Sequence, residues 1–184
     1  EGFELLDSLV VWGNRYNVYL ILDMHAAPGA QNTSDFSDSE FNGDSELFTS
    51  YTNQRWLAST WKHIANYYKS EPVIAGYDLL NEPARPGVAT TLRNIYEQCI
   101  DSIRTVDQNH MVIIEGNWYG NDHTGLFPPF DPNIVYSFHH YVGGINDTTT
   151  MYNQYRNGIA LQYNVPLWVG EFGENSNTCL LYTS

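Results

Sequence analysis

Residues 74–83 read Ile-Ala-Gly-Tyr-Asp-Leu-Leu-Asn-Glu-Pro, a short apolar run that ends in two polar side chains and a proline. Four more apolar runs of similar length lie at residues 19–25, 111–117, 134–141 and 165–172. They are mostly continuous rather than alternating, which is typical of strands buried on both faces of a parallel sheet. We therefore predict five parallel strands.

Amphipathic helices are predicted between these runs. Apolar residues recur at spacings of three and four over residues 3–15, 53–69 and 89–106, and in a less regular pattern over 148–163. Alternating helices and strands favour right-handed crossovers and a parallel sheet. The four strand-to-strand steps cover 146 residues, or about 37 each. A (β/α)8 barrel uses about 31 residues per unit, so these steps fit barrel units with one enlarged loop.

The composition excludes several classes of function. The 184 residues contain 8 Lys and Arg but 21 Asp and Glu, which gives a formal net charge of −13. A chain this acidic does not suit the phosphate backbone of a nucleic acid or an anionic membrane surface. No apolar run approaches the roughly 18 residues of a membrane-spanning helix. Aromatic residues make up 15% of the chain, which predicts a packed core rather than disorder.

Side chains capable of chemistry gather where the predicted strands end: His25, Asn81, Glu82, Glu115, Asn117, His139, Tyr141 and Glu171. Active sites of α/β proteins assemble at the carboxyl ends of strands. Glu82 precedes Pro83, which disfavours a helical backbone at Glu82, and Glu171 follows Gly170 at the end of another strand. Two glutamates placed in this way predict the carboxylate pair of a glycosidase, although each could instead pair with an arginine or cap a helix.

Four motifs in order resemble glycoside hydrolase family 5, the cellulase family. They are Asp-Met-His-Ala-Ala-Pro-Gly-Ala-Gln-Asn at 23–32, Asn-Glu-Pro at 81–83, His-His-Tyr at 139–141 and Trp-Val-Gly-Glu-Phe-Gly-Glu at 168–174. The resemblance implies an α/β chain that forms the third to seventh strands of a (β/α)8 TIM barrel. The family has an arginine on its second strand and a tryptophan on its eighth. In this chain the arginine would precede Glu1, and the tryptophan would follow Ser184.

The resemblance also implies roles for individual residues. Glu82 would be the general acid and base, and Glu171 the nucleophile of a retaining double displacement. Asn81 would bind the sugar 2-hydroxyl, and His25 and His139 would bind the sugar near the point of cleavage. Tyr141 would donate a hydrogen bond to Glu171. From its position after the 111–117 run, Trp118 could stack on a sugar ring, or else simply pack within its loop.

The predicted function is hydrolysis of β-glucan by an extracellular, monomeric enzyme, with endo-β-1,4-glucanase as the leading interpretation. Residues 23–32 also resemble the exo-β-1,3-glucanase branch of the family, which is the alternative. A more distant alternative is a barrel that binds carbohydrate without catalysing a reaction. A metal-dependent hydrolase would need better-spaced histidines than Asp-Met-His and His-His, so we predict no metal and no cofactor.

The two ends of the chain do not look like natural termini. Residues 2–6 already have the pattern of a helix interior, so we expect the natural start to lie upstream. Residues 179–184, Cys-Leu-Leu-Tyr-Thr-Ser, match a translated sequencing adapter, and we expect them to be a non-native read-through tail. Residues 1–178 would then form one partial catalytic barrel. Missing strands would leave two open edges, so we expect this piece alone to have little activity.

Overall fold

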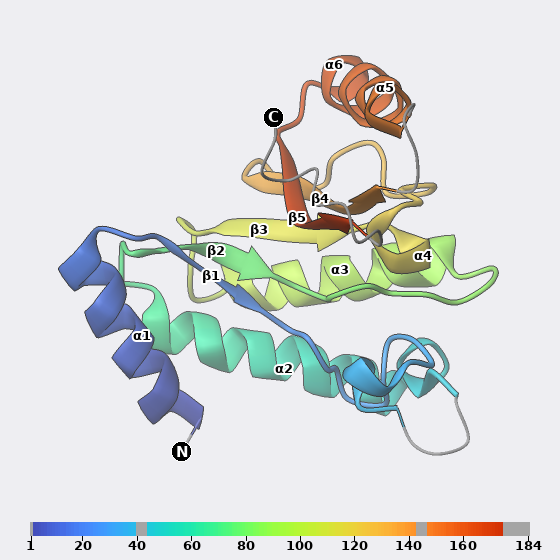
Figure 1. The fold of residues 1–184 in the computed structure, drawn as a ribbon. Coiled ribbons are helices and arrows are strands. Elements are labelled where there is room, and N and C mark those ends of the chain that lie inside the picture. The colour runs from blue at the N-terminus through green and yellow to red at the C-terminus, as the bar shows by residue number, and fades with distance from the viewer. Residues whose placement is uncertain (1, 40–43, 143–146, 175–184) are drawn as a thin grey trace.

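The computed structural model describes residues 2–39, 44–142 and 147–174. Five strands form one sheet in the order β1-β2-β3-β4-β5, and every neighbouring pair is parallel. The strands are β1 (Leu20–Asp23), β2 (Ile74–Asp78), β3 (Met111–Glu115), β4 (Ile134–Val142) and β5 (Leu167–Glu174). Each overlaps one predicted run, so the prediction of five parallel strands is confirmed (Figure 1).

Helices connect β1 to β2, β2 to β3 and β4 to β5, as the alternating pattern predicts, whereas residues 116–133 between β3 and β4 form a loop with one short turn. The long ones are α1 (Gly2–Tyr16), α2 (Tyr51–Tyr68) and α3 (Ala89–Arg104). The shorter elements are η1 (Asp35–Ser37), η2 (Glu46–Phe48), α4 (Asn117–Gly120), α5 (Asp147–Met151), η3 (Tyr152–Ala160) and α6 (Leu161–Tyr163). η3 is a π-helix, whose wider turn changes the spacing of side chains that share a face. That geometry explains the less regular apolar pattern of residues 148–163.

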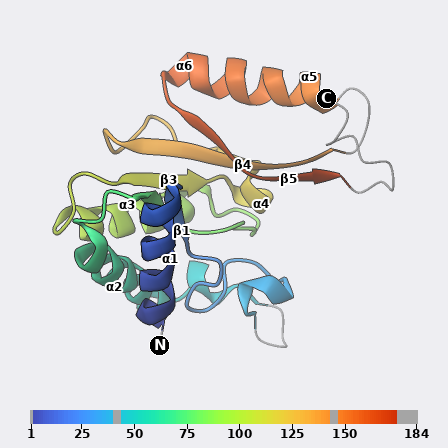
Figure 2. The same ribbon diagram turned by 60° about the vertical axis from the view of Figure 1, so that its left-hand side comes forward.

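The sheet is curved and the helices lie around its outside. Figures 1 and 2 show α1, α2 and α3 along the β1–β3 part of the sheet, and α5 to α6 beyond β4 and β5. The strands and helices therefore form a half-barrel, which is the partial (β/α)8 fold predicted from the sequence. The ends of the five strands that carry the predicted catalytic residues all lie along the same rim.

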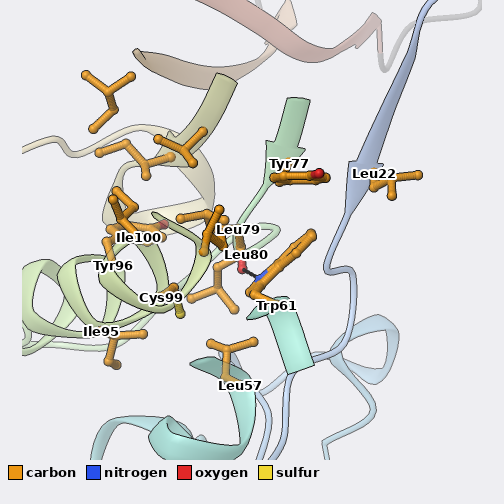
Figure 3. Packing of buried hydrophobic residues seen from close by; sticks show 14 of the residues in the cluster. Leu22, Leu57, Trp61, Tyr77, Leu79, Leu80, Ile95, Tyr96, Cys99 and Ile100 are labelled. Carbon is orange, nitrogen blue, oxygen red and sulfur yellow. Dashed lines mark hydrogen bonds between the residues drawn. The ribbon is translucent and has the colours of Figure 1, made fainter. Parts of the chain in front are cut away.

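A continuous apolar core joins α2 and α3 to the sheet. Trp61 of α2 is buried and its indole Nε1 donates a 3.0 Å hydrogen bond to the carbonyl of Leu79, just beyond β2 (Figure 3). Cys99 lies buried on the apolar side of α3, as the helical pattern predicts. This packing holds the segment that follows β2, and with it the residues of the Asn-Glu-Pro motif.

The edges of the described sheet are less well covered than its centre. On α1, the apolar side chains with the largest exposure are Leu5, Val11, Trp12 and Tyr16. On β5, Trp168, Val169 and Phe172 are exposed. No helix in the described ranges is long and apolar enough to cross a membrane. The predicted tail, residues 179–184, lies outside the described residues, so the division of the chain at residue 178 stays a prediction.

Candidate active site

Glu82 lies four residues beyond β2 in a backbone conformation that few side chains adopt. Its φ is 49°, in the left-handed region, so the backbone is non-helical as Pro83 suggests but is left-handed rather than extended. Its backbone N–H donates a 2.9 Å hydrogen bond to Oε2 of Glu115, and its carbonyl accepts a 2.9 Å bond from Nδ2 of Asn32. The unusual conformation is thus fixed by neighbours on both sides of the peptide.

The loop after β1 clamps the Asn-Glu-Pro segment from one side. Gln31 is fully buried, and its Nε2 donates 2.8 Å hydrogen bonds to the carbonyls of His25 and Asn81. The backbone N–H of Ala84 in turn donates to the carbonyl of Gln31. Reasoning from residue types assigned Gln31 and Asn32 no role, although both belong to the 23–32 motif. Their burial shows that this motif positions the site as well as contributing His25 to it.

Glu171 lies on β5 in register with His139 of β4. The glycines around it make room for the neighbouring strand. A Cβ added at Gly170 would lie 2.7 Å from Oγ of Ser137, and one at Gly173 would lie 2.9 Å from the Tyr141 ring. The hydroxyl of Tyr141 donates a 2.7 Å hydrogen bond to Oε2 of Glu171. Any larger side chain at these glycines would push β5 away from the two β4 residues that contact Glu171.

His139 brings the two predicted catalytic glutamates together. Its Nδ1 lies 2.7 Å from Oε1 of Glu82 and 3.6 Å from Oε2 of Glu171, and its Nε2 lies 3.1 Å from Oε1 of Glu115. Burial alone would lower the pKa of His139, but its hydrogen bonds to Glu115 and Glu82 outweigh burial and raise it to about 10. His139 is therefore an imidazolium at neutral pH, and its ring is buried in the wall of the site.

One carboxylate oxygen of Glu82, one of Glu171 and a ring nitrogen of His139 all lie within 4.8 Å of one another. Three such atoms could hold a metal ion in principle. A protonated Nδ1 that donates to Glu82 has no lone pair for a metal, however, and a metal would have to displace that proton. The donor set therefore fits a carboxylate pair with a charged histidine better than a metal centre.

Asn81 and His25 follow the neighbouring strands β2 and β1 at the same rim. The side chain of Asn81 is buried, and its Nδ2 has no hydrogen-bond partner among the described residues. His25 is exposed, and its Nδ1 is paired with Oδ2 of Asp23 at 2.8 Å. If Nδ1 carries the proton, Nε2 is left to accept a hydrogen bond. Both residues thus offer polar atoms that a sugar hydroxyl could use.

Trp118 and Tyr119 form a turn with two consecutive left-handed residues, at φ 55° and 60°. The N–H of Tyr119 donates to the carbonyl of Pro83, so the turn is anchored beside Glu82. Both rings are partly exposed, at 46% and 38%. A strained backbone that presents two aromatic rings next to an active-site carboxylate is typical of a functional site.

A hollow of about 290 Å³ opens between this turn, the end of β4 and η3. Its lining residues include Glu82, Tyr119, Asn121, His139, Tyr141 and Gln154. A second hollow of about 300 Å³ lies at the opposite end of the strands, around Gly13, Tyr19 and Pro72, and has no carboxylate in its lining. Of these two hollows, the one beside Glu82 contains the carboxylate and imidazole groups.

Comparisons with known proteins agree with this arrangement. The sequence profile of the cellulase family, glycosyl hydrolase family 5, matches residues 1–183. Endoglucanase 3 of Fibrobacter succinogenes is 30% identical over 96% of this chain and 27% of its own length. A β-xylosidase of Phanerodontia chrysosporium is 32% identical over 77% of this chain and 30% of its own length.

The chain therefore spans less than a third of the length of these two curated relatives. The crystal structure of the endoglucanase Cel5A of Thermotoga maritima superposes on 94% of this chain and 60% of its own, with a TM-score of 0.71 at 18% identity. At that identity the likeness concerns the fold, which is the partial barrel described above. The chain belongs to the cellulase family, glycosyl hydrolase family 5.

Proposed function

We propose that the protein is a retaining β-glycoside hydrolase in which Glu82 is the general acid and base and Glu171 is the nucleophile. The observation that carries this proposal is that an oxygen of Glu82, beyond the end of β2, lies within 4.8 Å of an oxygen of Glu171 on β5. Retaining glycosidases keep their carboxyl groups about 5–5.5 Å apart, whereas inverting enzymes need about 6.5–9.5 Å to admit a water between them. An oxygen–oxygen distance within 4.8 Å supports the shorter, retaining spacing.

The reaction follows from the contacts of each group. In the first step an oxygen of Glu171 attacks the anomeric carbon, and the glycosidic bond breaks as Glu82 gives its proton to the leaving oxygen. In the second step Glu82 takes a proton from water, and the resulting hydroxide displaces Glu171 from the sugar. The Tyr141 hydroxyl stabilises the ionised form of Glu171 before attack. The unpaired Nδ2 of Asn81 supplies a donor for the sugar 2-hydroxyl.

The substrate that we propose is a β-glucan chain, cleaved internally at β-1,4 bonds. The name of the Fibrobacter relative supports this choice, and a neutral glycan suits a chain with a net charge of −13. A polymeric substrate would place the enzyme outside the cell, and we propose that it acts there as a monomer. The resemblance of residues 23–32 to exo-β-1,3-glucanases favours laminarin, a β-1,3-glucan, as the second candidate.

The test uses the complete reading frame that contains this chain, with Glu82→Gln and Glu171→Gln as variants. We expect the parent to hydrolyse carboxymethylcellulose with a rapid loss of viscosity, and both variants to lose activity by several orders of magnitude. NMR of the first product should show a retained β-anomer. Turnover that survives both substitutions would exclude these two carboxylates. If the parent instead hydrolyses laminarin faster than carboxymethylcellulose, and releases sugar from chain ends without lowering the viscosity of the polymer solution, the activity is that of an exo-β-1,3-glucanase.

A further inference from the structure

Glu115, the last residue of β3, is a buried carboxylate whose two oxygens are both used inside the site. Its side chain is 1% exposed. Oε2 accepts the 2.9 Å hydrogen bond from the backbone N–H of Glu82, and Oε1 lies 3.1 Å from Nε2 of His139. His139 in turn contacts the carboxylate of Glu82. Glu115 therefore acts on Glu82 along two routes, one through its backbone and one through its side chain.

The fold holds Glu115 itself in one position. The hydroxyl of Tyr96, fully buried on α3, donates a 2.9 Å hydrogen bond to the carbonyl of Glu115 and accepts a 3.2 Å bond from its N–H. On the other side the α4 turn closes over the carboxylate, because a Cβ added at Gly120 would lie only 3.1 Å from Oε2. Figure 3 shows Tyr96 within the packed core beside Ile95 and Cys99. Packing in the core thus fixes the position of Glu115, whose carboxylate reaches the rim of the sheet where Glu82 lies.

The backbone route matters because Glu82 has a φ of 49°. A left-handed conformation costs an ordinary residue free energy and persists only where its surroundings hold it. The Glu115 carboxylate is one of two side chains that do so, together with Asn32. Loss of that acceptor would leave the N–H of Glu82 unpaired in a half-buried position and would loosen the direction in which the carboxylate points.

The side-chain route concerns charge. Five carboxyls interact electrostatically with His139: Asp23 from β1, Asp78 from β2, Glu82 from the segment beyond it, Glu115 from β3 and Glu171 from β5. Among them Glu115 binds Nε2, while Nδ1 faces the two catalytic glutamates. A negative charge on the far side of the ring offsets the cation. It thereby holds in place the ring that contacts the Glu82 carboxylate.

We propose that Glu115 is a positioning residue of the glycosidase reaction, which holds the acid–base glutamate in its reactive orientation by bonding both its backbone and the histidine beside it. This inference rests on the proposed function of Glu82. It assigns a role on the reaction pathway to a residue that touches neither the substrate nor the reacting atoms.

Glu115→Gln in the complete protein is the sharpest test, because an amide keeps the shape but has one acceptor for two donors. We expect kcat to fall by roughly 10- to 100-fold, the loss typical of removing a partner that orients an active-site group, with KM nearly unchanged. The pKa of His139, followed by nitrogen NMR, should fall in this variant, because the hydrogen bond to Glu115 is one of the two that raise it. Glu115→Asp, which keeps the charge, should restore the pKa of His139. Glu46→Gln, an exposed glutamate of η2, is the matched control and should match the parent.

Each outcome separates this inference from the proposed function. If Glu82→Gln and Glu171→Gln abolish turnover while Glu115→Gln leaves both kcat and the pKa of His139 unchanged, the role of Glu115 is wrong and the catalytic pair stands. A lower kcat with an unchanged pKa of His139 would also overturn it, since a purely structural residue would give that result. If Glu115→Gln fails to fold, nitrogen NMR of histidine in the parent protein replaces it. A neutral His139 ring at pH 8 would then refute the proposal, and a protonated ring would support it.

Discussion

The hydroxyl of Tyr141 on β4 donates a 2.7 Å hydrogen bond to Oε2 of Glu171 on β5. Tyr141 is in register with Gly173, so its side chain reaches back two residues along β5 to make this bond. The bond raises the pKa of Tyr141 to about 12, with burial as a smaller cause, so the phenol stays a donor throughout the neutral and alkaline range. A donor that favours the ionised form of Glu171 also keeps it ready to attack.

Tyr141→Phe removes that donor and leaves the ring in place. We expect kcat to fall by roughly 100-fold, as when one donor to a reacting oxygen is lost. Tyr51→Phe, on the exposed start of α2, is the control. A Tyr141→Phe enzyme with the parent's kcat would contradict the role given to this bond.

Two substitutions at Trp118 distinguish the role of its ring in substrate binding from the effect of its left-handed backbone on protein stability. Trp118→Ala and Trp118→Gly both remove the ring, so both should raise KM, by roughly tenfold if the ring covers a sugar. The glycine variant should be about 1 kcal/mol more stable than the alanine variant, because only glycine adopts φ 55° without strain. Enzyme kinetics and chemical denaturation measure the two effects. An unchanged KM in both variants would return Trp118 to simple loop packing.

Much of the fold could be predicted from the sequence because its signals are local. Continuous apolar runs with three- and four-spaced helices between them were enough to place all five strands. The end of each strand was harder to predict, since β2 as observed stops at Asp78 while its apolar run continues to Leu80. Beyond Asp78 the backbone still bonds to its neighbours, as in the bond from Asn81 to the carbonyl of Met24, but it no longer follows the regular ladder.

The site shows a sharper limit. Strand-end position and flanking residues identified Glu82, Glu171, His139 and Tyr141, and the structure brings these four together. The sequence could not show that His139 is sandwiched between carboxylates, because that depends on the packing of β3 against β4. It could not show the clamp by Gln31 either, whose contact with Asn81 spans fifty positions of the chain. The signal in both cases is a polar residue buried by tertiary contacts, which no local pattern reveals.

Chelation distinguishes the carboxylate pair from a metal-dependent reaction. We expect prolonged dialysis against EDTA to leave kcat and KM unchanged, because the proposed steps use only Glu82, Glu171 and water. The measurement is hydrolysis of carboxymethylcellulose before and after dialysis, with a known zinc hydrolase treated in parallel as the positive control. Loss of activity that is restored by added Zn²⁺ would instead assign the cluster of Glu82, His139 and Glu171 to a metal.

The exposed edges predict how the 184 residues behave alone. Trp12 on α1 and Phe172 on β5 are 55% and 64% exposed, and β1 and β5 each have one side without a strand partner in the described sheet. Such edges favour association between copies. We expect the isolated chain to elute from a sizing column as large aggregates with little activity, whereas the complete reading frame elutes as a monomer and is active. A monodisperse, fully active isolated chain would show that the half-barrel is self-sufficient.

At the other end of the barrel, Arg104 and Asp131 form a pair that should affect stability and leave catalysis untouched. Nε and Nη2 of Arg104 donate to the two oxygens of Asp131 at 2.8 and 2.9 Å, and Nη1 donates to the carbonyls of Asp107 and His110. Arg104 thus ties the end of α3 to the segments that lead into β3 and β4. Burial alone would raise the pKa of Asp131, but the bonds from Arg104 and Asn133 outweigh burial and lower it.

Because the pKa of Asp131 is lower in the folded protein, its contribution to stability is complete above the unfolded value, about 3.9, and is lost as the pH falls through the folded value. Asp131→Asn should therefore reduce the free energy of unfolding by about 2 kcal/mol at pH 7, and by progressively less below pH 4. Urea denaturation at several pH values measures this difference, with the exposed Asp101→Asn on α3 as control. The kcat of the variant at pH 7 should equal that of the parent, since the pair lies at the amino ends of the strands. A destabilisation that is the same at pH 7 and pH 3 would show that Asp131 stabilises the fold by packing rather than by its charge.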